Sequence, residues 1–303
     1  MKKDFLRLAE LSREELAHLL DRAAWWKAHR TDAAAPRPLA GKSVALLFDK
    51  ASTRTRVSLE VAAAELGGRA IFASGRDSQL GRGEPPEDTA RVLSRMVHAV
   101  CIRTFSHEWL ERFARAATIP VVNALTDLTH PLQLLADLLV LRERFGRTEG
   151  LKVAWIGDGN NVAHAFIEAA PLAGFELSLA CPAGYLPDGA ALAWARERGA
   201  RVQVVDDPRA AARGAHALVT DVWASMGQEA EQAARKQAFA GYCVDESLLE
   251  AALPEAIVLH CLPAHRGEEI SAAAIDGPRS AVWDEAENRL HTSKALLESL
   301  LRN

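Results

Sequence analysis

A run of hydroxyl and arginine side chains lies between two apolar stretches of the sequence. Residues 52–56 read Ser-Thr-Arg-Thr-Arg, after an apolar run at 44–48 and before a stretch with helical character at 57–66. A helix N-terminus presents free backbone N–H groups and a positive dipole end, which suit an anion. Guanidinium groups match phosphate oxygens in pairs. The segment therefore indicates an anion site, although a capped helix with two solvated arginines would contain the same residues.

A second predicted helix start carries a histidine and a glutamine. His130 and Gln133 precede the apolar helix expected at 134–145, and Pro131 suits a first helical turn, where its missing N–H costs nothing. Either polar side chain can bind a ligand. His130 can equally pack on the turn as a cap residue, and Gln133 can be a solvated residue of the first turn.

Two polar groups follow predicted strands in the second half. Asp221 comes directly after an apolar strand, and His260 and Cys261 lie at the end of another. Ligands bind at the carboxyl ends of strands in parallel sheets. Asp221 can instead cap the helix expected at 230–239, and a lone cysteine is more often inert packing than chemistry. Beside a histidine and a proline-closed loop, the thiol becomes a candidate for an acid–base or ligand role.

Two glycines after a strand raise the possibility of a dinucleotide site. Gly157 and Gly159 match the start of the glycine fingerprint, but Val162 occupies the third glycine position. Cys181 and Pro182 replace the acidic residue expected at the end of the next strand. The sequence therefore disfavours an NAD-binding oxidoreductase.

Strands and helices alternate through both halves, which predicts an α/β fold of two domains, each a mostly parallel sheet flanked by helices. Strands are predicted at 44–48, 70–73, 99–103, 120–123, 151–156, 176–180, 201–205, 215–220 and 257–262. Helices are predicted at 5–30, 57–66, 88–97, 108–117, 134–145, 162–173, 189–198, 230–239 and 284–301. The irregular polar stretch 74–87 is long enough to be a functional loop. The domain boundary is expected near 130–145.

Composition excludes several classes of function. The 303 residues carry a formal net charge of −4, without the basic face that a duplex nucleic-acid binder needs. The four cysteines are scattered and form no C-x-x-C pair, which argues against a zinc site and a disulfide framework. The N-terminus has no apolar signal-peptide core, and no apolar run reaches membrane length. A cytoplasmic protein that binds neither membrane nor nucleic acid is expected.

Together the motifs resemble those of the ornithine carbamoyltransferase family, within the aspartate/ornithine carbamoyltransferase superfamily. The motifs Ser52-Thr-Arg-Thr-Arg56, His130-Pro-x-Gln133, Asp221-x-x-x-Ser225-Met-Gly227 and His260-Cys-Leu-Pro263 occur in order across essentially the whole chain. The first two resemble carbamoyltransferases in general, and the last two resemble the ornithine branch, since the aspartate branch lacks them. Leu132 departs from the cysteine or threonine that is frequent there.

The resemblance implies a reaction in which carbamoyl phosphate and L-ornithine give L-citrulline and phosphate. It implies direct attack by the amine, with no covalent enzyme intermediate, no cofactor and no metal. It also implies a carbamoyl phosphate-binding domain at 1–133, on which the C-terminal helix 286–303 packs back, and an ornithine-binding domain at 134–285. A homotrimer or a multiple of trimers and a role in arginine biosynthesis are further implications.

The resemblance also implies a role for individual residues. The implied carbamoyl phosphate contacts are Ser52, Thr53, Arg54, Thr55, Gln79, Arg103, His130, Gln133, Cys261, Leu262 and Arg289. The implied ornithine contacts are Asn161, Asp221, Ser225 and Met226. The implied catalytic residues are Arg103, His130 and Cys261. Gln79 is implied to reach carbamoyl phosphate in a neighbouring subunit, and Cys261 to bind substrate and handle protons without acting as a covalent nucleophile. Two possibilities remain for Arg56: it braces the turn, or it pairs with a carboxylate of the fold.

Two other functions fit the same residues. A carbamoyltransferase that acts on another amine, such as putrescine, would share the first two motifs. A catalytically inactive relative could bind phosphate or ornithine as a sensor, but a chemically competent residue occupies each expected catalytic position. A citrulline assay with alternative amines separates the three possibilities.

Overall fold

The computed structural model of the chain describes residues 3–75, 83–224 and 229–302. It divides into two compact units. Unit 1 comprises residues 1–139 and 287–303, and unit 2 comprises residues 140–286. Helices α5 (Pro131–Phe145) and α12 (Val282–Leu301) both run across the division. Each unit is described by itself.

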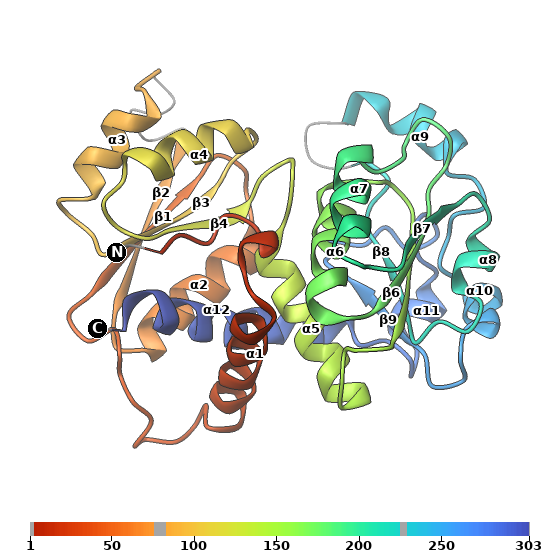
Figure 1. Ribbon diagram of the computed structural model, residues 1–303, viewed down its shortest axis with the longest axis horizontal. Coiled ribbons are helices and arrows are strands. Elements are labelled where there is room, and N and C mark those ends of the chain that lie inside the picture. Colours follow the sequence, from red (N-terminus) through yellow and green to blue (C-terminus); the bar gives the residue numbers. More distant parts are fainter. Residues whose placement is uncertain (1–2, 76–82, 225–228, 303) are drawn as a thin grey trace. The chain divides into compact units, whose positions relative to one another are not determined.

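Unit 1 contains a four-stranded parallel sheet in the order β2-β1-β3-β4 (Figure 1). The strands are β1 (Ser43–Phe48), β2 (Arg69–Ser74), β3 (Ala99–Arg103) and β4 (Val121–Leu125). The helices are η1 (Leu8–Glu10), α1 (Arg13–Ala28), α2 (Thr53–Glu65), α3 (Pro86–Leu93) and α4 (His107–Ala116). Phe48 pairs with both Ser74 and Arg103, so the carboxyl ends of three strands meet at one edge of the sheet.

Apolar side chains hold the layers of unit 1 together. Buried residues of β1 and β3 pack against Leu110 and Phe113 of α4 and Ala90 of α3.

On helix α12, the buried carboxylate of Glu298 accepts hydrogen bonds from Arg22 Nε (2.6 Å) and Trp26 Nε1 (2.8 Å) of α1. The C-terminal helix belongs to the first unit from Glu287 onward.

Unit 2 contains a five-stranded parallel sheet in the order β7-β6-β5-β8-β9. The strands are β5 (Lys152–Ile156), β6 (Glu176–Ala180), β7 (Val202–Val205), β8 (Ala217–Thr220) and β9 (Ile257–His260). The helices are α6 (Asn161–Ala173), α7 (Gly189–Glu197), α8 (Pro208–Ala212), η4 (Glu229–Glu231), α9 (Gln232–Ala238), α10 (Glu246–Ala251) and α11 (Ala272–Asp276). The chain turns from β5 towards β6 and later to β8 on the other side. The carboxyl ends of β5 and β8 therefore form a topological switch point, where open α/β sheets bind ligands.

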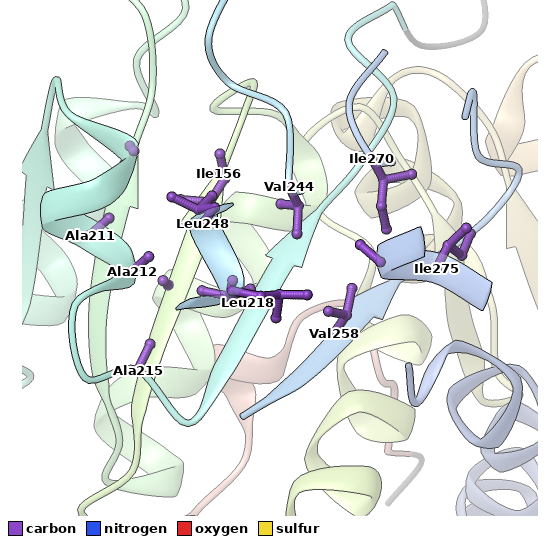
Figure 2. Packing of buried hydrophobic residues seen from close by; sticks show 14 of the residues in the cluster. Ile156, Ala211, Ala212, Ala215, Leu218, Val244, Leu248, Val258, Ile270 and Ile275 are labelled. Carbon is purple, nitrogen blue, oxygen red and sulfur yellow. The ribbon is translucent and has the colours of Figure 1, made fainter. Parts of the chain in front are cut away.

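The predicted fold class is confirmed, and each predicted strand lies within two residues of an observed one. Three short helices, α8, α10 and α11, were missing from the prediction because five or six residues are too few to show a helical period. Their buried residues cover one face of the second sheet: Figure 2 shows Ala211 and Ala212, Leu248 and Ile275 around Leu218 and Val258. The single helix predicted at 5–30 was wrong, since the chain breaks after η1 and restarts at Ser12, which forms a capping box with Glu15.

None of the helices that the structure describes is both long and apolar enough to cross a membrane.

Candidate active site

Helix α2 begins four residues earlier than its apolar pattern predicted. Ser52 is the N-cap, and its hydroxyl accepts a hydrogen bond from the backbone N–H of Thr55 at 3.2 Å. Residues 53–56 therefore form the first helical turn, directly after the carboxyl end of β1. The capping alternative holds for the Ser52 hydroxyl, while the N-terminus of the helix, with its positive dipole end, remains suited to an anion.

Arg56 contacts a carboxylate of its own helix and an aromatic ring of β2. Its Nε donates to Glu60 Oε1 at 2.9 Å, and its guanidinium lies 3.7 Å from the ring centre of Phe72 on β2. The expectation that Arg56 meets a carboxylate is confirmed.

A buried network joins three of the predicted carbamoyl phosphate residues. Arg289 of α12 donates from Nη2 to Thr55 Oγ1 at 2.8 Å and from Nη1 to Gln133 Oε1 at 2.5 Å. The Gln133 amide donates in turn to Asp137 Oδ1 at 2.8 Å. The N-terminal turns of α2 and α5 and the middle of α12 are therefore fixed to one another by side chains nearly closed to solvent.

His130 is buried where α5 begins, and its carbonyl accepts the backbone N–H of Gln133 at 3.1 Å. Burial, reinforced by the charges of Arg289, Arg103 and Arg54, holds the pKa of His130 well below its usual range. Its ring is therefore neutral near pH 7, and Nδ1 has no hydrogen-bond partner among the described residues. Unit 1 thus gathers three guanidinium groups around one neutral imidazole, an arrangement that suits a small dianion.

In unit 2, parallel pairing brings Asp221 next to Cys261. Thr220 pairs with His260, so the residues that follow the two strands are neighbours. The Cys261 thiol donates to Asp221 Oδ1 at 3.0 Å, and the Val222 N–H donates to the same oxygen at 2.8 Å. Asn160 Nδ2 donates to the other oxygen, Oδ2, at 2.8 Å. Asp221 is 7% exposed, and both oxygens of its carboxylate accept hydrogen bonds.

His260 shapes the loop that carries Cys261 and Leu262. Its Nδ1 accepts the Leu262 N–H at 2.9 Å, so its proton lies on Nε2, which donates to the buried carboxylate of Glu269 at 3.0 Å. Leu262 has a φ of 59° and is followed by a cis peptide bond to Pro263. This turn ends β9 at His260, two residues earlier than predicted.

Arg235 is a buried residue that motif reasoning missed. Its Nη1 donates to Asp158 Oδ2 and to the carbonyl of Trp223, both at 2.8 Å, and its Nε donates to Glu231 at 2.9 Å. It ties the chain just after Asp221 to the turn that follows β5. In the sequence it is one of several polar residues of the predicted helix 230–239, and nothing there indicates that it is buried.

The remaining predicted residues are placed less completely. Asn161 is the first residue of α6, next to Asn160, which the sequence reading passed over although its place before the helix is typical of an N-cap. Gln79, Ser225 and Met226 lie outside the described residues.

Two groups of side chains within the described ranges have spacing compatible with a metal ion. Asp221, His260 and Cys261 form one, and His265, Glu268 and Glu269 form the other. In the first, both ring nitrogens of His260 already have hydrogen-bond partners. In the second, Glu268 is paired with Lys236 at 2.6 Å. Neither arrangement indicates a metal site.

Comparison with known families places the whole chain in one class. Residues 3–143 match the aspartate/ornithine carbamoyltransferase carbamoyl-P binding domain, and residues 149–300 match the Asp/Orn binding domain of the same family. The chain therefore belongs to the aspartate/ornithine carbamoyltransferase family, and it is a transferase.

Individual relatives narrow the class to its ornithine branch. The ornithine carbamoyltransferase of Halorhodospira halophila is 57% identical over 299 residues, which cover 99% of both chains. That of Geobacter sulfurreducens is 52% identical over the full length of both. Among solved structures, ornithine carbamoyltransferase from Pyrococcus furiosus superposes with a TM-score of 0.95 at 45% identity, covering 99% of this chain and 97% of that one. The enzyme from Thermus thermophilus gives 0.91 at 47%, with 99% of each chain covered. The resemblance read from the four motifs is confirmed.

Proposed function

We propose that this chain transfers the carbamoyl group of carbamoyl phosphate to the δ-amine of L-ornithine, forming L-citrulline and phosphate. The names of its relatives support ornithine carbamoyl transfer. The observation that carries the proposal is that the cationic groups lie in one unit and the buried carboxylate in the other. Unit 1 offers three guanidinium groups around a neutral histidine, and unit 2 offers one fixed, nearly buried carboxylate beside a thiol.

The cationic group in unit 1 suits carbamoyl phosphate. The N–H groups of the α2 turn, with the hydroxyl of Thr53 and the guanidinium of Arg54, bind the phosphate. Arg103 and His130 face the carbonyl oxygen. Arg289 and Gln133 are already fixed to each other and to Thr55, so little ordering remains to be done when the substrate binds.

The chemistry follows from these charges. Asp221 holds the α-ammonium group of ornithine and leaves the δ-amine free to attack. The positive charges of the guanidinium groups disfavour the ammonium form of the δ-amine. They therefore lower its pKa and favour the neutral amine, which is the nucleophile. Negative charge then develops on the carbonyl oxygen, where Arg103 and the N–H of His130 stabilise it. The C–N bond forms, the bond from the carbonyl carbon to the phosphate oxygen breaks, and the proton that the amine loses ends on that oxygen, so hydrogen phosphate leaves towards Arg54 without a covalent enzyme intermediate.

A substrate panel tests the proposal. We expect ornithine to be used with a kcat/KM about ten- to a hundredfold above putrescine, aspartate and N-acetylornithine. Putrescine lacks the α-carboxylate, aspartate lacks the side-chain amine and N-acetylornithine has its α-amine blocked, and one lost charged hydrogen bond costs about 1.5–3 kcal/mol. Citrulline, or the corresponding carbamoylated product, is measured at saturating carbamoyl phosphate. Preference for any other amine would contradict the proposal.

We also propose a homotrimer or a multiple of trimers, in which Gln79 reaches the carbamoyl phosphate of a neighbouring subunit. The edge strand β2 supports this arrangement, because Ile71 on it and Val57 on α2 are about half exposed. Light scattering should give a mass of three, or a multiple of three, times the 32.8 kDa chain. A monomer at assay concentration would contradict it.

We further propose that the enzyme works in the cytoplasm in arginine biosynthesis. The product citrulline is a carbamoylated form of ornithine that further steps can convert to arginine. Deleting the gene should make growth depend on arginine or citrulline, and growth restored by ornithine alone would contradict this role.

A further inference from the structure

We infer that Asn160 is a positioning residue: it orients the Asp221 carboxylate so that one acceptor position on Oδ2 faces the cationic group of the amino-acid substrate. This inference rests on the proposed function. It concerns a residue of the turn after β5 that belongs to none of the four motifs.

The amide of Asn160 can take only one orientation. Its Oδ1 accepts two backbone N–H groups at the start of α6, from Val162 at 2.9 Å and from Ala163 at 3.2 Å. Exchanging the amide oxygen and nitrogen would place NH₂ against these two donors. The helix therefore fixes Nδ2 towards Asp221 Oδ2, which it reaches at 2.8 Å.

The position of Asn160 in the sheet explains why it acts on this carboxylate. Asn160 lies four residues after the end of β5, and Asp221 directly follows β8. The two strands are parallel neighbours at the switch point of the sheet, as the pairing of Trp155 with Val219 shows. The Asn160 amide thus spans the crevice in which such folds hold their ligands.

The hydrogen bonds of Asp221 show which acceptor position remains. A carboxylate offers about four acceptor positions, two on each oxygen. The Val222 N–H and the Cys261 thiol use both positions on Oδ1, and Asn160 uses one on Oδ2. Within the described residues, the other position on Oδ2 is the one left for a ligand. A carboxylate this buried strengthens a hydrogen bond from an ammonium group.

Removing the amide should weaken substrate binding without unfolding helix α6. Asn160→Ser keeps a good N-cap but cannot reach Asp221. Asn160→Asp keeps the cap and the size, but it replaces the donor with a second carboxylate against Oδ2. The two variants therefore separate the capping role from the positioning role.

Steady-state kinetics and thermal unfolding of the full-length enzyme test the inference. For Asn160→Ser we expect a melting temperature close to wild type, an ornithine KM raised about tenfold, the equivalent of about 1.4 kcal/mol, and a carbamoyl phosphate KM within about twofold. As a matched control, Asp188→Ser changes the N-cap of α7, where Asp188 Oδ1 accepts the Ala190 N–H at 2.8 Å. It should leave the ornithine KM unchanged.

The Asn160→Asp variant adds a pH readout that a capping role would not move. Two adjacent carboxylates share a proton as pH falls, and that proton restores a donor to Oδ2. The ratio of its ornithine KM to the wild-type value should therefore shrink between about pH 8.5 and pH 6. An unchanged ornithine KM in Asn160→Ser, with a lower melting temperature, would overturn the positioning role alone. A wild type that forms no citrulline would overturn the proposed function as well.

Discussion

His130 lies at the start of a helix, and its protonation state decides what it can do there. Its sequence position before Pro131 predicted a helix start, and the structure places it there, fully inside unit 1. The sequence could not reveal its charge state, because burial and, after it, three guanidinium groups from distant segments lower its pKa. A neutral ring keeps an N–H that can donate to a developing oxyanion in a site already rich in positive charge.

The buried neutral histidine predicts a pH dependence of stability. The pKa of His130 is lower in the folded chain than the value of about 6.5 expected in the unfolded chain. As pH falls below about 6.5 the unfolded state binds this proton first, so the free energy of unfolding falls by up to about 1.4 kcal/mol per pH unit. In His130→Gln the loss between about pH 7.5 and 5.5 should be smaller by about 1–2 kcal/mol, as measured by urea unfolding.

The exposed His18 provides the control, since His18→Gln should retain the wild-type pH dependence. The same pH dependence in His130→Gln and in the wild type would contradict a buried, neutral His130.

At the scale of elements, the sequence predicted what repeats and missed what is short or set by tertiary contacts. Apolar runs in the sequence located all nine strands of the described residues. The helices α8, α10 and α11 are too short to show a helical period. The early start of α2 depends on Ser52 as a cap, a signal weaker than the apolar residues from 57 onward. Asn160 was missed because its role depends on the pairing of β5 with β8, which a linear motif does not contain.

The glycines of the turn after β5 also have a role that depends on tertiary contacts. Sequence reasoning rejected a dinucleotide site there, and the structure supplies another reason for the glycines. Gly157 has a φ of 137°, in the range that favours glycine. A Cβ on Gly159 would lie 2.2 Å from the backbone nitrogen of Pro187 and 2.5 Å from the carbonyl carbon of Leu186.

Gly159→Ala should therefore destabilise the protein by about 1–3 kcal/mol, because the new methyl group meets backbone atoms that cannot rotate away. Denaturant unfolding measures the effect. Gly189→Ala is the matched control, since its Cβ would meet no atom within 4 Å and alanine is a better helix former. Equal stability of Gly159→Ala and the wild type would show that the two segments are not packed as described.

At the scale of the whole molecule, two units with separate parallel sheets carry complementary chemistry. The sequence indicated a boundary near 130–145, and the units divide between residues 139 and 140, inside the continuous helix α5. No change of composition marks that point, because a continuous buried helix needs no linker. The cationic group belongs to unit 1 and the fixed carboxylate belongs to unit 2, so each unit should govern the binding of a different substrate.

The most direct test of this account measures both KM values in one variant from each unit. Arg54→Ala should raise the carbamoyl phosphate KM by about tenfold or more, through loss of a charge-assisted hydrogen bond, and leave the ornithine KM within about twofold. Asp221→Asn should do the reverse, because a neutral amide cannot form an ion pair with the α-ammonium group. Near wild-type turnover of Arg54→Ala at limiting carbamoyl phosphate, or a rise in the same KM for both variants, would contradict the assignment of one substrate to each unit.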